Sequence, residues 1–76
     1  MPKAKDVLTL WVFYDHPTDH PRFIVLRRWF QVMHRVYPGP CELFDTLEEG
    51  RSRLPRGLTR IARQLGEDPK IIETWL

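Results

Sequence analysis

Cysteine is almost absent from this chain, and no hydrophobic run is long. Cys41 is the single cysteine among 76 residues, which excludes an intramolecular disulfide and any zinc site built from several cysteines. The apolar run Val7–Tyr14 has eight residues and leads directly into Asp15. It is therefore too short to span a membrane, and no signal-peptide cleavage site follows it. The sequence predicts a reducing compartment and a cytoplasmic protein.

The length of the chain leaves no room for a second domain. Domains of this size bury only about 60% of the surface of the unfolded chain, and so small a core does not divide. Hydrophobic residues make up 42% of the chain and aromatic residues 12%, which suffices for a packed core and argues against disorder. We expect one domain over residues 1–76, with a flexible N-terminus at residues 1–5.

Acidic residues are missing from the two segments that hold most of the arginines. Pro21–Tyr37 interleaves four arginines with four aromatic residues, and Arg51–Gln64 holds five further arginines. Four acids gather between these segments, within Glu42–Glu49. The net charge of +2 thus conceals a separation by position, which predicts surface patches of each sign. Such patches suit a protein partner as well as a nucleic acid.

Two strands are expected in the first half of the chain. Val7–Tyr14 is β-branched and aromatic, as in a central strand, and the two prolines and two aspartates of Asp15–Arg22 predict a loop. From Phe23 to Val36 the residues alternate: Leu26 and Phe30 share one face, and neighbouring positions share the other. This pattern favours a second strand, antiparallel to the first. A helix is the competing interpretation, because some apolar residues also fall at helical spacing.

The middle of the chain carries a break and a helix signal. Pro38-Gly39-Pro40 predicts a break, followed by a short edge strand at Cys41–Asp45. Thr46-Leu-Glu-Glu49 has the form of a capping box, in which the threonine oxygen and the glutamate side chain each bond the other's backbone amide. A short helix is predicted over Leu47–Leu54, ended by Pro55-Arg-Gly57.

The last twenty residues allow two interpretations. Leu58–Leu65 and Lys70–Leu76 form two strands in the first, whereas Asp68-Pro69 begins a final helix in the second. The β-branched and aromatic residues after Lys70 favour strands. The predicted fold is α+β, an antiparallel sheet of four or five strands with one short helix on one face. An exposed edge strand would also permit a dimer, so both a monomer and an edge-strand dimer stay open.

Three segments resemble a group of small uncharacterised proteins from bacteria and their prophages. They are Trp11-Val-Phe-Tyr-Asp-His-Pro-Thr-Asp-His-Pro21, Val25-Leu-Arg-Arg-Trp29 and Asp68-Pro-Lys-Ile-Ile-Glu-Thr-Trp-Leu76. The resemblance implies an accessory gene of a mobile element and assigns no catalytic residues. Small proteins of this setting are often inhibitors that occlude a host machine, and anti-CRISPR proteins are an example.

Two places in the sequence hold residue types that bind metals or act in catalysis, but neither has the residue pattern that such a site requires. Asp15-His16 and Asp19-His20 bring carboxylates and imidazoles together but match no known ligand spacing, so a turn is the preferred interpretation. Cys41 could serve as a nucleophile with a histidine as its base, but the sequence shows no glycine-rich segment to form an oxyanion hole and no third residue to orient the base. We therefore predict no catalysis, no metal and no cofactor.

The arginines and aromatics remain as the candidate binding residues, because guanidinium groups pair with carboxylates and phosphates while rings stack. The predicted contact residues are Arg27, Trp29, Arg35, Tyr37, Arg51, Arg53, Arg56, Arg60 and Arg63. We expect a non-enzymatic binding protein, an inhibitor of the anti-CRISPR kind that occludes a host protein or ribonucleoprotein. The alternative is a small basic domain that binds nucleic acid directly.

Overall fold

Five strands and one helix follow one another in the computed structural model, which describes residues 7–76. The predicted flexible N-terminus at residues 1–5 lies outside the described residues. The elements are β1 (Val7–Asp15), β2 (Ile24–Val32), β3 (Arg35–Phe44), α1 (Leu47–Arg51), β4 (Arg60–Ala62) and β5 (Ile71–Trp75). No helix within residues 7–76 has the length and apolarity needed to cross a membrane.

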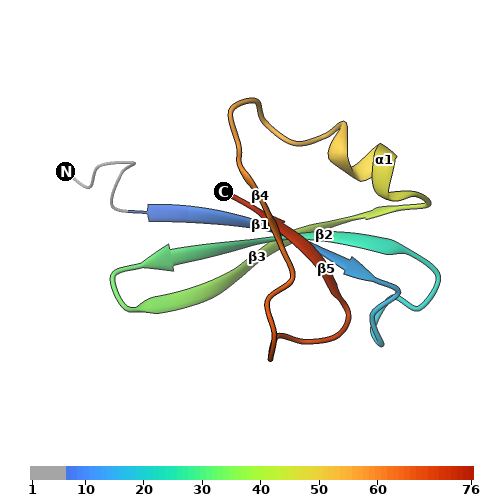
Figure 1. Cartoon of the computed structure of the whole chain (residues 1–76), viewed down its shortest axis with the longest axis horizontal. Coiled ribbons are helices and arrows are strands. Elements are labelled where there is room, and N and C mark those ends of the chain that lie inside the picture. The colour runs from blue at the N-terminus through green and yellow to red at the C-terminus, as the bar shows by residue number, and fades with distance from the viewer. Residues whose placement is uncertain (1–6) are drawn as a thin grey trace.

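All strands belong to one antiparallel sheet with the order β3-β2-β1-β5-β4. β1 pairs with β2 over its full length and with β5 from Trp11 to Tyr14, so it is the central strand. The β4–β5 hairpin crosses the long β1–β3 meander (Figure 1). Four or five antiparallel strands with one short helix were predicted, and the sheet has five strands and one helix. Strands dominate the fold, so the α+β class is confirmed only loosely.

The register of β1 and β2 assigns their side chains to two faces. Phe13 lies opposite Leu26, and Leu10 lies opposite Trp29. Directly opposite residues of antiparallel strands point to the same face, so the predicted alternation along β2 is confirmed. The face that carries Phe13 and Leu26 also carries α1, and we call it the helix-bearing face. The face that carries Trp29 is the open face.

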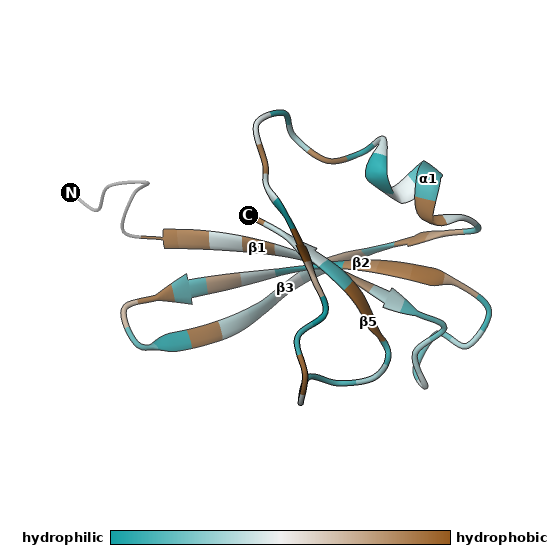
Figure 2. Ribbon diagram, in the orientation of Figure 1, coloured by the Kyte–Doolittle hydropathy of each residue, from teal (hydrophilic) through white to brown (hydrophobic). Residues whose placement is uncertain are grey.

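The core lies between the helix-bearing face and α1. Phe13, Ile24 and Leu26 are buried at its centre. Partly buried residues that pack around them are Trp11, Phe44, Leu47, Leu54, Ile72 and Trp75. Hydrophobic residues follow β1, β2 and β5, whereas the turns are mostly hydrophilic (Figure 2).

The predicted capping box begins α1. The Glu49 amide donates to Thr46 Oγ1 at 3.2 Å, and the Thr46 amide donates to Glu49 Oε1 at 3.1 Å. Gly50 lets the helix rest on the core, because a Cβ at this position would collide with the Phe13 ring. The helix ends at Arg51 rather than at the predicted Leu54, since the Ser52 hydroxyl bonds the Glu49 carbonyl at 2.6 Å and caps it.

The predicted break at Pro38-Gly39-Pro40 is wrong. These residues lie inside β3, and the actual turn is at Met33 and His34, where Met33 has a φ of 57°. β3 is an edge strand, where prolines are tolerated because no ladder bond is lost. The pairing shifts register between Arg27 and Trp29, which accommodates this segment. The predicted strands Phe23–Val36 and Cys41–Asp45 are thus parts of a β2–β3 hairpin.

The C-terminal strands are confirmed, and they are shorter than predicted. β4 has three residues and β5 has five. The register of β5 against β1 shifts between Phe13 and Tyr14, which are paired with Glu73 and Ile71. This bulge leaves Ile72 without a partner on β1. Glu73 lies opposite Phe13 and therefore points to the helix-bearing face.

Candidate macromolecule-binding surface

Four strands contribute one residue each to a row of arginines and tryptophans. Trp11 on β1 lies opposite Arg28 on β2 and opposite Trp75 on β5. Arg60 on β4 lies in turn opposite Trp75. All four side chains therefore point to the helix-bearing face, in the order Arg28, Trp11, Trp75, Arg60. The Arg28 guanidinium carbon is 5.4 Å from the centre of the Trp11 ring, a cation–π contact.

The aromatic character continues from this row toward the β2–β3 turn. Phe30 pairs with Tyr37, and Val32 pairs with Arg35, on the same face. Tyr37 is 46% exposed. Because α1 lies at the opposite end of the sheet (Figure 1), it leaves this end uncovered. We call the whole patch the arginine–aromatic surface: Trp11, Arg28, Phe30, Arg35, Tyr37, Arg60 and Trp75.

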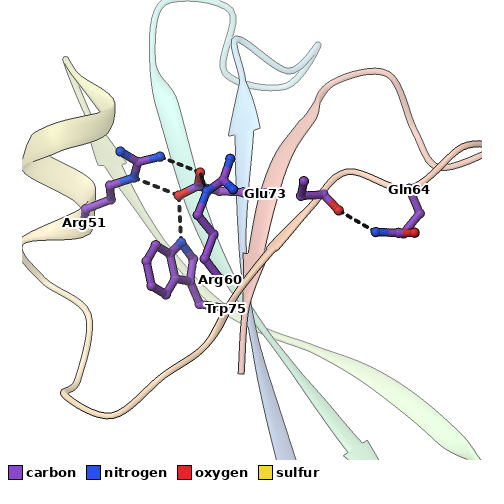
Figure 3. A network of polar contacts seen from close by, with 6 residues as sticks. Arg51, Arg60, Gln64, Glu73 and Trp75 are labelled. Atoms are coloured by element: carbon purple, nitrogen blue, oxygen red, sulfur yellow. Dashed lines mark hydrogen bonds and ion pairs between the residues drawn. The ribbon is translucent and has the colours of Figure 1, made fainter.

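Glu73 holds the Arg60 and Trp75 side chains, at one end of the row, by hydrogen bonds. Its side chain is fully buried, with 0% exposed. Arg51 donates to it twice, from Nε to Oε2 at 2.8 Å and from Nη2 to Oε1 at 2.6 Å. Arg60 Nε donates to Oε1 at 2.9 Å, and Trp75 Nε1 donates to Oε2 at 2.7 Å. Figure 3 shows the two arginines reaching this carboxylate from α1 and from β4.

The charge of Glu73 is maintained by these four hydrogen bonds. Burial raises the pKa of a carboxyl group, but the bonds from Arg51, Trp75 and Arg60 outweigh burial and lower the pKa of Glu73 to about 2. The bond to Glu73 likewise raises the pKa of Arg51. At neutral pH the three charged side chains carry a net charge of +1.

The cluster also has a structural role, since it joins three elements that are distant in sequence. α1 has five residues and β4 has three, and elements this short gain little stability on their own. Arg51 ties α1 to β5, and Arg60 ties β4 to β5, through one carboxylate. No buried side-chain nitrogen or oxygen in residues 7–76 is left without a hydrogen-bond partner.

Arg27 and Trp29, two of the predicted contact residues, lie on the open face. Trp29 Nε1 donates to the Tyr14 hydroxyl at 3.0 Å, and Arg27 Nη1 donates to the Gly39 carbonyl at 3.0 Å. Burial raises the pKa of Tyr14. These side chains line a hollow of about 410 Å³, with Asp68 and Lys70 also at its wall. An adjoining hollow of about 370 Å³ is mainly apolar.

The other predicted contact residues are divided among several places. Arg35 and Tyr37 belong to the arginine–aromatic surface, and Arg51 and Arg60 meet at Glu73. Arg53 forms an exposed ion pair with Glu42 at 3.4 Å. Arg56 and Arg63 are exposed in the segments that flank β4 and form no ion pair within residues 7–76. One continuous strip of all these arginines therefore does not exist.

Sequence reasoning missed the residue that organises the site, which is Glu73. One signal was present: the carboxylate stands in a β-forming segment, two residues before Trp75, where period two places both on one face. Arg28, Phe30 and the two tryptophans of the row were also absent from the predicted contact set. Arg27 points to the open face and Arg28 to the helix-bearing face, because successive residues of a strand alternate between faces.

The pairs Asp15-His16 and Asp19-His20 do not come together as a metal site. Asp15 contacts His16, and Asp19 Oδ2 lies 3.9 Å from His20 Nε2. Within residues 7–76, no three side chains of His, Cys, Asp or Glu gather to hold a metal ion. Cys41 is a partly buried free thiol on β3, opposite Arg27.

Comparison of this chain with models of protein families, with curated proteins and with solved structures gives no match. A function for this chain must therefore be inferred from the surface itself.

Proposed function

We propose that this is a non-enzymatic, cytoplasmic binding protein that contacts a partner protein or ribonucleoprotein through its arginine–aromatic surface and occludes it. The observation that supports this proposal is the row Arg28, Trp11, Trp75 and Arg60, which four strands present on one face. Tryptophan, tyrosine and arginine are the residues most enriched among those that dominate the energy of protein interfaces.

The rigidity of the surface supports a role in binding. Its residues stand on paired strands, and the Arg60 and Trp75 side chains are each bonded to the buried Glu73. Side chains already held in one conformation lose less entropy when a partner binds. A partner therefore meets a surface that is largely formed in advance.

Occlusion is the simplest way for so small a domain to act on a larger assembly. The surface offers aromatic area and positive charge, and it needs no chemistry of its own to block a substrate path or a subunit contact. The setting implied by the resemblance, an accessory gene of a mobile element, makes a host assembly the proposed target.

Affinity capture from lysate of a bacterial host tests this proposal. The tagged wild-type protein is expected to retain a defined partner under native conditions, and a variant with Arg28 and Tyr37 replaced by serine is expected to lose it. A variant with Arg56 and Arg63 replaced by serine is the matched control, because these arginines are exposed and lie outside the surface. Equal recovery by both double variants would overturn the proposal.

Direct binding of nucleic acid is the second candidate, and the contact of Arg28 with Trp11 favours it because single-stranded bases stack on such platforms. Binding of this kind weakens with salt in proportion to the phosphates neutralised. A fluorescence titration of a single-stranded oligonucleotide at several salt concentrations distinguishes the two functions. A steep dependence that flattens in the Arg28→Ser variant would establish nucleic acid as the ligand, whereas absence of binding at low salt would remove it.

A further inference from the structure

We infer that Arg51 and Arg60 together form an oxyanion-binding site at the edge of the arginine–aromatic surface, and that a carboxylate of the partner protein occupies it. The partner in this inference rests on the proposed function. The site itself rests on the hydrogen bonds around Glu73 and can be tested with small anions alone.

Glu73 uses only part of the hydrogen-bond donor capacity of Arg51 and Arg60. A guanidinium group has five N–H donors. Arg51 gives two N–H groups to Glu73 through Nε and Nη2, and Arg60 gives one through Nε. Both Nη groups of Arg60, and Nη1 of Arg51, have no hydrogen-bond partner within residues 7–76.

The two guanidinium groups are held close together. Arg51 Nη2 and Arg60 Nε bond the same atom, Glu73 Oε1, at 2.6 and 2.9 Å. The separation of these two nitrogen atoms cannot exceed the two bond lengths combined, so the guanidinium groups of Arg51 and Arg60 lie side by side at Glu73. The carboxylate of Glu73 is fully buried, and both arginines approach it (Figure 3), while their own side chains stay partly exposed.

Both arginine side chains are accessible to solvent and together carry an excess of positive charge. The side chains of Arg51 and Arg60 are 40% and 49% exposed. Two positive charges against one negative charge leave an excess of +1 at this point. Guanidinium forks match carboxylate and phosphate groups geometrically, and a fork that is already immobilised loses less entropy on binding.

A carboxylate is favoured over a phosphate backbone because the excess charge is local. Arg53 is paired with Glu42, and Arg27 and Arg28 point to opposite faces. The arginines thus form no continuous track for successive phosphates, whereas a single acidic side chain needs only one site. Trp75, whose indole bonds Glu73 from the same cluster, offers an apolar wall beside it.

The test is an NMR titration of the full-length protein at low ionic strength, first with inorganic phosphate and acetate. The signals to follow are the Nε–H groups of Arg51 and Arg60 and the indole N–H of Trp75. We expect saturable shifts confined to these signals. Arg60→Lys keeps a charge for Glu73 but removes the free fork, and it is expected to weaken binding about tenfold, the loss of one charge-assisted hydrogen bond. The control is Arg63→Lys, which should bind as the wild type does.

The outcomes of this titration test separately whether the anion site exists and whether a carboxylate occupies it. Absence of saturable shifts, or equal binding by Arg60→Lys and the wild type, overturns the oxyanion site whatever the partner is. A short acidic peptide that competes with phosphate supports the carboxylate, whereas a single-stranded oligonucleotide that competes while the peptide does not overturns it. Failure to capture any partner from lysate would overturn the proposed function while leaving small-anion binding intact.

Discussion

At the scale of single residues, Glu73 is the side chain on which the site depends most. It is fully buried, and it receives four hydrogen bonds from three residues. A buried charge is tolerable only when such partners satisfy it. Removal of this charge should therefore lower the stability of the fold and release both arginines from their positions.

Glu73→Gln tests this dependence with almost no change in volume. In either orientation the glutamine amide places its N–H groups against a donor of Arg51, and also against Arg60 or Trp75. We therefore expect a loss of about 1.5–3 kcal/mol in the free energy of unfolding, the value of a hydrogen bond to a charged group. Urea unfolding measures it. A loss below about 0.5 kcal/mol, as at ordinary surface positions, would contradict the account.

The pKa of Glu73 makes a second prediction, on the pH dependence of stability. The folded pKa is about 2, and the ordinary value is 4.5. Above pH 4.5 both the folded and the unfolded chain are ionised and the stabilisation is complete. As the pH falls from 4.5 toward 2, the unfolded chain takes up the proton first, so the stabilisation is lost.

Comparison of the wild type with Glu73→Gln isolates this effect from the other carboxylates. The difference between their unfolding free energies should be largest at neutral pH and should shrink between pH 4.5 and 2. A difference that is constant across this range would mean that Glu73 has no depressed pKa.

The sequence predicts which residue types carry the surface, and strand alternation predicts that Arg27 and Arg28 take opposite faces. It does not predict that the face of the core residue Leu26 also presents the arginine–aromatic surface. Arg27 and Arg28 are chemically equivalent in the sequence, and only the core position of Leu26 tells which arginine shares its face. Alternation places Glu73 on the face of Trp75, but it gives no sign that the carboxylate is buried. That burial depends on Arg51 and Arg60, which are distant from Glu73 in the sequence.

At the scale of elements, α1 shows how much of the fold local sequence determines. The capping box at Thr46 and Glu49 is readable from four residues and is present as predicted. Gly50 is not readable in that way. Its function is the close approach of the helix to Phe13, a contact between segments far apart in the chain.

Gly50→Ala tests this approach. Alanine favours a helix over glycine by about 1 kcal/mol, so propensity alone predicts a gain in stability. The added Cβ would instead collide with the Phe13 ring, and overpacking of a core costs about 1–3 kcal/mol. We expect net destabilisation in thermal or urea unfolding. Glu48→Ala, at an exposed position of the same helix, is the control and should change stability by less than about 0.5 kcal/mol; a stabilising Gly50→Ala would contradict the packing.

β3 shows the opposite case, in which a strong local signal is overridden. Pro38-Gly39-Pro40 is typical of a loop, yet it lies within a strand. The strand is at the sheet edge, and Gly39 has Phe30 and the Arg28 carbonyl so close that a Cβ would not fit. The prolines also remove donors from an exposed edge, which limits pairing with other chains. Edge position is a property of the whole sheet, so the sequence of three residues could not reveal it.

At the scale of the whole molecule, the two faces of the sheet have different characters. The helix-bearing face presents rings and arginines beyond the reach of α1, whereas the open face is hollowed around Tyr14 and Trp29. Predicted contact residues fall on both. We propose that the helix-bearing face, and not the open face, binds the partner.

Arg27 and Arg28 provide a matched pair for testing that claim, since they are adjacent in sequence and point to opposite faces. The most direct measurement is capture of the partner from host lysate by the wild type, Arg27→Ser and Arg28→Ser, after unfolding curves have shown that each variant is folded. Arg28→Ser is expected to lose the partner, and Arg27→Ser is expected to retain it. Loss with Arg27→Ser and retention with Arg28→Ser would contradict it and transfer the binding function to the open face.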